Sequence, residues 1–331
     1  MPRQIFPFTS NAPPALACSN GLFCLAWTDE QHILRVAFSS DGGNHWDGGR
    51  SVRVDLNSEP ETSMARPALA FFNNALYIAW TGTDNPGGSG VGTLSIAKCL
   101  EPGVTNFTAK KVLWGETTPS PFGPALAVSE EGGGGNVLVL LWTGSNGERT
   151  LSKRWSSDGV TWPDKDKLIY WGFGSLDGPA AAGTRAELLM AFTAAGQNRL
   201  LLCYSNITGG TLPGGPGSGF HIYNGDPPPG VDNSYWGPSL AFDPTVGNTY
   251  LGYTSSGPAQ NMYLLSQGGG VLSAPSFRDK LVDTSPFAPA VCTPNNGSTT
   301  PFLAWLATNG AHNIVFADYD SMPKVYVNGN G

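Results

Sequence analysis

The sequence predicts an all-β protein, a six-bladed β-propeller whose blades are four-stranded antiparallel sheets. Three observations lead to this prediction: a motif that occurs six times, a similar set of apolar segments in every repeat, and a composition rich in turn-forming residues. The 331-residue chain contains 44 glycines and 27 prolines, and only 13% of its residues are charged. Such a composition favours many turns and few helices.

The repeat is marked by a serine, followed four residues later by a proline and then by a small residue. Successive serines are 51 to 59 residues apart, and internal repeats of roughly 20–50 residues usually indicate propellers or solenoids. The six pairs are Ser10/Pro14, Ser63/Pro67, Ser120/Pro124, Ser175/Pro179, Ser234/Pro238 and Ser285/Pro289. We therefore place residues 1–331 in a single propeller domain, with inner strands that begin near residues 10, 63, 120, 175, 234 and 285.

Each repeat contains three apolar segments, and the first five repeats add a more polar fourth one. In the first repeat the inner segments are PALAC, LFCLAWT and ILRVAFS. Inner strands are apolar because neighbouring blades cover both of their faces, whereas the outer strand meets water. The segment QIFPF stands before Ser10, where other repeats have their fourth strand. We expect this N-terminal strand to close the last blade, with KVYV near the C-terminus as the competing candidate.

Residues that recur in all six repeats are predicted to serve the fold. The second segments end in aromatic residues that suit packing between blades. These are Trp27, Trp80, Trp142, Phe192, Tyr253 and Trp305. The six serine hydroxyls are expected to satisfy backbone groups near the axis.

Two turns between third and fourth segments share a pattern. The first repeat has Ser39-Ser40-Asp41-Gly42-Gly43-Asn44-His45-Trp46, and the third has Ser156-Ser157-Asp158-Gly159-Val160-Thr161-Trp162. Asp and Ser side chains bond the backbone of such turns, and Gly supplies positive φ. The first turn resembles the Asp box of the sialidase-like (BNR-repeat) propellers, and the second resembles its shorter variant. The resemblance implies a sialidase-like fold, with these boxes as folding elements remote from any active site.

The resemblance also implies what a sialidase would need: three arginines that grip the substrate carboxylate, a tyrosine nucleophile activated by a glutamate, and an aspartate acid/base. Among the ten arginines of the sequence, only Arg66 stands at the entry to an inner strand. We therefore interpret the chain as a non-sialidase member of this superfamily.

Candidate binding residues stand where the repeats differ. Positions just before each repeat proline, and the loops between second and third segments, are expected to face one central mouth. Aromatic side chains with a few polar groups suit sugar recognition by stacking and hydrogen bonding. The predicted ligand contacts are Arg66, Asp84, Phe122, Asn146, Asp177, Tyr235, Trp236 and Phe287.

The leading hypothesis is a carbohydrate-binding, lectin-like propeller that recognises a glycan at the central mouth or in clefts between blades. The alternative is a glycoside hydrolase or other sugar-processing enzyme, which needs two carboxyl groups roughly 5–10 Å apart. Glu61, Asp84 and Asp177 are the candidates for that role. A propeller that binds a small hydrophobic molecule or a protein is a third possibility.

Charge and composition exclude several other classes. The net charge is −7 and no basic run is present, which argues against nucleic acid as a partner. No apolar stretch approaches the roughly 18 residues of a membrane span, and the start lacks the layout of a signal peptide. We expect a soluble protein, either cytoplasmic or secreted without a visible signal peptide.

The sequence leaves the oligomeric state open. It also predicts no metal site and no cofactor, because the four histidines are dispersed and the five cysteines form no Cys-x-x-Cys pair. Cys18 and Cys24 flank one predicted hairpin and would be able to pair in an oxidising compartment.

Overall fold

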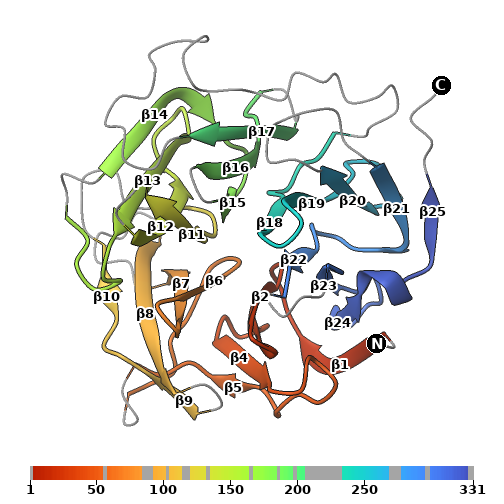
Figure 1. The fold of residues 1–331 in the computed structure, drawn as a ribbon, viewed down its shortest axis with the longest axis horizontal. Coiled ribbons are helices and arrows are strands. Elements are labelled where there is room, and N and C mark those ends of the chain that lie inside the picture. The colour runs from red at the N-terminus through yellow and green to blue at the C-terminus, as the bar shows by residue number, and fades with distance from the viewer. Residues whose placement is uncertain are drawn as a thin grey trace.

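The computed structural model describes residues 3–54, 58–83, 92–101, 104–113, 120–131, 135–163, 167–184, 187–196, 200–205, 233–267, 277–294 and 299–326. Within these residues the chain forms six antiparallel sheets, arranged as a ring around a central axis (Figure 1). The fold is an all-β propeller.

The first three sheets follow one another along the chain. The first contains β2 (Ala15–Ser19), β3 (Leu22–Thr28), β4 (Leu34–Ser39) and β5 (Arg50–Ser51). The second contains β6 (Ala68–Phe72), β7 (Ala75–Gly82), β8 (Thr93–Glu101), β9 (Val104–Phe107) and β10 (Lys111–Val112). The third contains β11 (Ala125–Glu131), β12 (Gly135–Thr143), β13 (Thr150–Ser156) and β14 (Lys167–Gly174).

The other three sheets complete the ring. The fourth contains β15 (Ala180–Gly183), β16 (Leu188–Thr193) and β17 (Leu200–Ser205). The fifth contains β18 (Ser239–Asp243), β19 (Asn248–Thr254), β20 (Asn261–Gln267), β21 (Phe277–Thr284) and β25 (Lys324–Tyr326). The sixth contains β22 (Ala290–Cys292), β23 (Phe302–Leu306), β24 (Asn313–Asp318) and β1 (Gln4–Thr9), and the 3-10 helix η2 (Tyr319–Ser321) follows β24.

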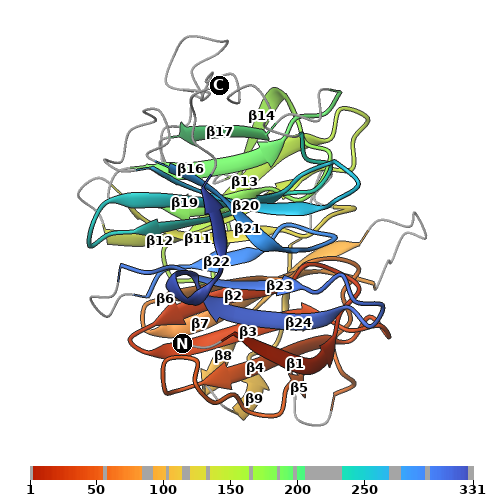
Figure 2. The same ribbon diagram turned by 90° about the vertical axis from the view of Figure 1, so that its right-hand side faces the viewer.

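The two ends of the chain lie in different sheets. β1 pairs with β24, so the sixth sheet combines N-terminal and C-terminal residues, which Figure 2 shows as red and blue strands side by side. β25, which contains most of the segment KVYV, pairs instead with β21 at the edge of the fifth sheet. That competing candidate is therefore wrong for the sixth sheet, because β1 already occupies the edge of β24.

The number of strands varies from sheet to sheet, so the expectation of uniformly four-stranded sheets needs correction. The second and fifth sheets have five strands each, since β9 and β25 add to them. The described part of the fourth sheet has three strands, and its predicted fourth segment, FHIYN, lies outside the described residues.

The ring closes through the first strand of every sheet. Each first strand contacts the first strands of both neighbouring sheets, including β22 against β2. These strands are short and rich in alanine, as in β2 (ALACS) and β15 (AAAG). Small side chains are needed there because six strands converge on one narrow axis.

The hydrophobic core lies between adjacent sheets. Trp80 packs with residues of the first and second sheets, and Trp142 with residues of the second and third. Trp80, Trp142 and Trp305 are completely buried. The prediction that the second-strand aromatics pack between blades is confirmed for these residues.

Serine and threonine hydroxyls bond the backbone at the entry to the first strands, and threonines link neighbouring sheets at five of the six junctions. Ser10 Oγ donates to the carbonyl of Thr28 and accepts the N–H of Ala12. Thr28 Oγ1 donates to the carbonyl of Ala65, just before β6, over 2.8 Å. The four equivalent links are Thr81 to Phe122, Thr143 to Asp177, Thr193 to Trp236 and Thr254 to Phe287. The serines of the other five repeats accept a backbone N–H in the same way as Ser10, so the predicted structural role of the serine motif is confirmed.

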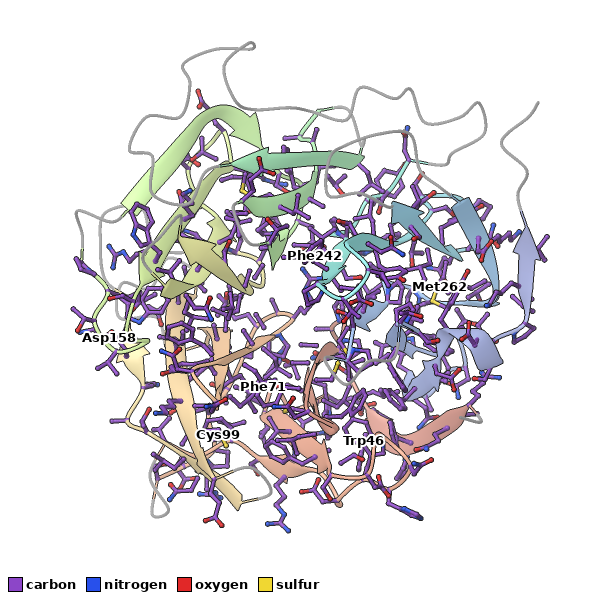
Figure 3. The ribbon with its side chains drawn as sticks, viewed as in Figure 1. Trp46, Phe71, Cys99, Asp158, Phe242 and Met262 are labelled. Carbon is purple, nitrogen blue, oxygen red and sulfur yellow. The ribbon has the colours of Figure 1, made fainter. Side chains whose placement is uncertain are left out.

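The two Asp-containing turns are closed by their own side chains. Asp41 Oδ1 accepts the backbone N–H of His45 and the hydroxyl of Ser39, and Asp158 is bonded in the same way by Thr161 and Ser156. These bonds lower the pKa of both carboxyl groups. Figure 3 places Trp46 and Asp158 toward the outside of the ring, away from its centre.

Candidate functional site

The axis of the ring contains three consecutive cavities. The mouth cavity, of about 370 Å³, lies where the first strands begin. A narrow waist of about 80 Å³ follows, and a far cavity of about 420 Å³ lies where the first strands end. Arg66 lines both the mouth cavity and the waist, so it stands at the boundary between them.

Three glycines at equivalent positions of consecutive repeats, Gly123, Gly178 and Gly237, form a partial collar around the axis at the mouth. A side chain on Gly123, Gly178 or Gly237 would overlap the carbonyl oxygen of the equivalent residue in the preceding sheet. Glycine is required at these positions because neighbouring backbones approach so closely. The equivalent residue of the second sheet is Arg66, whose carbonyl contacts the collar at Gly123.

The Arg66 side chain crosses the axis. Its two terminal nitrogens donate to the carbonyls of Pro179 and Pro238, each over 2.9 Å, which belong to the fourth and fifth repeats. Burial lowers the pKa of the Arg66 guanidinium, and the charge of Asp177 opposes that change. The guanidinium thus forms the floor of the mouth cavity, and two of its five N–H donors are committed to the backbone.

Asp177 is also engaged with the backbone of the collar. Its Oδ1 accepts the N–H of Gly178 and its Oδ2 accepts the N–H of Gly237, each over 2.7 Å. The carboxylate therefore bridges the fourth and fifth repeats. Among the described residues that line the mouth cavity, Asp177 is the only acid and Arg66 the only base.

Aromatic side chains form one wall of the mouth. Trp236 packs edge-on against Phe287 and against Tyr235, with ring centroids 6.0 Å apart in both pairs. Tyr235 is 51% exposed, whereas Trp236 and Phe287 are half-buried. Since Thr193 and Thr254 hold the carbonyls of Trp236 and Phe287, the backbone that presents these rings is fixed.

Phe122 lies on another part of the rim, together with a residue that the sequence interpretation missed. The guanidinium carbon of Arg149 stands 5.5 Å from the centre of the Phe122 ring. Arg149 also donates to the carbonyl of Leu176, another lining residue. Its place between β12 and β13, in a loop that the repeat directs toward the mouth, was the signal that would have identified it.

The structure brings most of the predicted binding residues together and separates a few. Phe122, Asp177, Trp236 and Phe287, two positions before their prolines, all line the mouth, as do Arg66 and Tyr235. Asn146 does not line it; its side-chain oxygen instead accepts the N–H of Thr150 within an exposed turn. Asp84 lies outside the described residues.

Glu61 is not among the described residues that line the mouth. Its carboxylate forms an ion pair with Lys110 over 2.9 Å and is largely buried. Its backbone bonds Val52 and Leu34 of the first repeat, which holds the residue between the first two sheets. The described lining of the mouth therefore does not contain the pair Glu61 and Asp177 that a glycosidase would use.

In the part of the chain that is described, His, Cys, Asp and Glu side chains form no group of three or more that would suit a metal ion. Within the same residues, no helix has the length and apolar character needed to cross a membrane.

Comparison with known proteins identifies the fold of this chain but does not assign it to a family. No protein-family model matches the chain, and no curated protein matches it. Solved structures do match. A Hadza microbial sialidase superposes with a TM-score of 0.62 at 13% identity, over 94% of this chain and 66% of that one. The sialidase of Trypanosoma rangeli, solved with the inhibitor DANA, gives 0.57 at 15% identity, over 94% and 55%.

A lectin has the same fold over its whole length. The Aleuria aurantia lectin, solved as a mutant with α-methyl-L-fucoside, gives a TM-score of 0.55 at 13% identity, over 97% of this chain and 98% of that one. The chain thus spans between about half and two thirds of the sialidases, but nearly all of the lectin. Its fold is that of sialidases and fucose-binding propeller lectins.

Proposed function

We propose that this protein is a carbohydrate-binding, lectin-like propeller whose ligand lies in the mouth cavity. The observation that supports this most is the composition of the cavity wall. Four aromatic residues line the cavity, while the charged groups of Arg66 and Asp177 are bonded to the backbone. Rings stack on the apolar faces of sugars, and a volume of about 370 Å³ lies within the range of small-molecule sites.

The chemistry of the wall also indicates the class of sugar. A carboxylated sugar is recognised best by several guanidinium groups that can bind in a bidentate manner. Both terminal nitrogens of Arg66 donate hydrogen bonds to backbone carbonyls, and the guanidinium of Arg149 lies over the Phe122 ring. We therefore propose a neutral sugar with an extended apolar face.

The test is a glycan array probed with the full chain, followed by titration of the best glycan. Replacing Trp236 or Phe122 with Ala is expected to weaken binding about tenfold, since a stacked ring contributes about 1.4 kcal/mol. Phe71→Ala is the matched control, because Phe71 lines only the far cavity. Failure to bind any glycan would refute the function, and equal losses in all three variants would refute the site.

A glycoside-processing enzyme is the second candidate, supported by the shared fold of the sialidases. It requires a second carboxylate beside Asp177, and Asp84 is the remaining candidate from the sequence. Incubation with a panel of neutral and sialylated chromogenic glycosides separates the two functions. Turnover that is lost in both Asp177→Asn and Asp84→Asn would replace the lectin proposal.

We also propose that the six sheets are six blades of one propeller domain, and that β1 closes the last of them. The pairing of β1 with β24 supports this proposal. Deleting residues 1–9 would expose the edge of β24, which is expected to lower the melting temperature and promote association. An unchanged melting temperature in the shortened chain would contradict it.

A further inference from the structure

The junction between the first and sixth sheets, which we call the closing junction, differs from the other five. The chain crosses this junction between β1 and β2, but the other strands of the sixth sheet come from the opposite end of the sequence. The hydroxyl link is also missing: the sixth sheet has Leu306 where the other five have threonine, and Leu306 is completely buried. The closing junction therefore lacks one of the bonds that hold every other pair of neighbours.

Two cysteines face each other across this junction. The sulfur of Cys18, on β2, lies 2.7 Å from the sulfur of Cys292, on β22, although the residues are 274 positions apart. Both are free thiols in this structure. They pack in the same hydrophobic cluster of the first and sixth sheets.

Comparison among the repeats shows that this pairing is particular to the closing junction. Cys292 is the third residue after its repeat proline, and the other five repeats have alanine there. These alanines are Ala17, Ala70, Ala127, Ala182 and Ala241. Cys18 is the fourth residue after its proline, where the other repeats have Phe71, Val128, Gly183, Phe242 and Thr293.

Both thiols are accessible from the far cavity, which they help to line. Phe71 and Phe242 line the same cavity and lie near the centre of the ring in Figure 3. Cys18 is half-buried and Cys292 is 6% exposed. Pairing of Cys18 with Cys24 is incompatible with the register, because Cys18 lies opposite Phe23 and successive residues point to opposite faces.

We propose that Cys18 and Cys292 form a disulfide that locks the closing junction when the protein meets a small disulfide oxidant. The Cys18 thiolate attacks one sulfur of oxidised glutathione and releases one glutathione thiol. The Cys292 thiolate then attacks the sulfur of Cys18 and releases the second glutathione. Two protein thiols are oxidised, one glutathione disulfide is reduced, and the two protons pass to the released glutathiones.

The order of the two steps follows from burial. Burial and the neighbouring Cys18 raise the pKa of Cys292, which makes Cys18 the first nucleophile. The disulfide joins β2 of the first sheet to β22 of the sixth. It closes a loop of 274 positions in the unfolded chain, and the lost conformational entropy of that chain stabilises the folded state.

The experiment equilibrates the full chain with oxidised glutathione and, separately, with a reductant. We expect the oxidised sample to lose about 2 Da and to yield one cross-linked peptide that contains Cys18 and Cys292. Titratable thiols in denaturant should fall from five to three. The melting temperature should rise by roughly 3–6 °C.

Two variants make the test specific. Cys292→Ala introduces the residue of the other five repeats, so it should fold but show neither the mass change nor the dependence of its melting temperature on oxidant. Cys99→Ser leaves the pair intact and should behave as the wild type. Five free thiols after oxidation, a mixed disulfide with glutathione that persists at Cys18, or a cross-link between other cysteines would overturn the proposal.

Discussion

Replacing Arg66 with methionine tests whether this residue holds the ring together or serves the ligand. Methionine is similar in length but donates no hydrogen bond. The carbonyls of Pro179 and Pro238 would each lose a charged donor at 2.9 Å, and water would have to replace it at the boundary of the mouth and the waist. We expect the variant to be less stable because these carbonyls come from two sheets on the far side of the axis.

The magnitude follows from the two hydrogen bonds. Each bond from a charged donor contributes about 1.5–3 kcal/mol, so the pair contributes about 3–6 kcal/mol. Desolvation of the guanidinium, which also lowers its pKa, offsets part of this sum. We expect a net loss of about 2–4 kcal/mol, which for a chain of 331 residues corresponds to roughly 3–6 °C in melting temperature.

The assay is urea and thermal unfolding of the wild type, Arg66→Met, Arg66→Lys and Arg149→Met. An ammonium group can reach only one of the carbonyls well, so Arg66→Lys should fall between the wild type and Arg66→Met. Arg149→Met is the matched control, since Arg149 is exposed on the rim. A loss below about 0.5 kcal/mol in Arg66→Met would refute the reasoning, because it would place Arg66 among ordinary surface residues.

Two further predictions concern buried positions. Gly178→Ala should destabilise the fold by more than about 1 kcal/mol, because the new methyl group would overlap the Gly123 carbonyl. Gly147→Ala lies in an open turn and should not destabilise the fold. Equal effects of the two substitutions in urea unfolding would contradict the close backbone approach at Gly178. Burial lowers the pKa of Lys153 from 10.5 to about 8, so the unfolded state binds the proton more tightly and folded stability rises with pH between these values. Lys153→Met should therefore stabilise the protein by an amount on the order of 3 kcal/mol at pH 7, and by less as pH approaches 10.5; a gain that does not change with pH would argue against this origin.

The all-β propeller fold was predictable from the sequence because the repeat marks where each first strand starts. Counting back from the prolines was sufficient to group Phe122, Trp236 and Phe287 at one opening, since a shared backbone position in every repeat is also a shared position around the axis. It did not predict that β25 joins the fifth sheet, because KVYV has the pattern of any edge strand. Pairing there depends on the path of η2 after β24.

The repeat pattern did not predict which partners individual charged side chains contact. Glu61 belongs to the segment before Ser63, yet its carboxylate turns to Lys110, 49 residues away. The bonds of Arg66 span 113 and 172 residues. Such partners are set by the closure of the whole ring, and no local spacing in the sequence encodes them.

Differences among the repeats fall into two physical classes. Arg66 and Asp177 depart from the glycine and aromatic pattern of their positions, but each is bonded to backbone groups of other repeats. Cys18 and Cys292 differ from the residues that the other repeats have at their positions, and they do so as a pair at a single junction. In each case the unusual residue contacts another repeat of the ring. The aromatic residues Phe122, Trp236 and Phe287 also differ between repeats, but their rings border the open volume of the mouth cavity. The aromatic residues therefore border the open volume of the mouth, whereas the charged groups of Arg66 and Asp177 are bonded to the backbone of the ring.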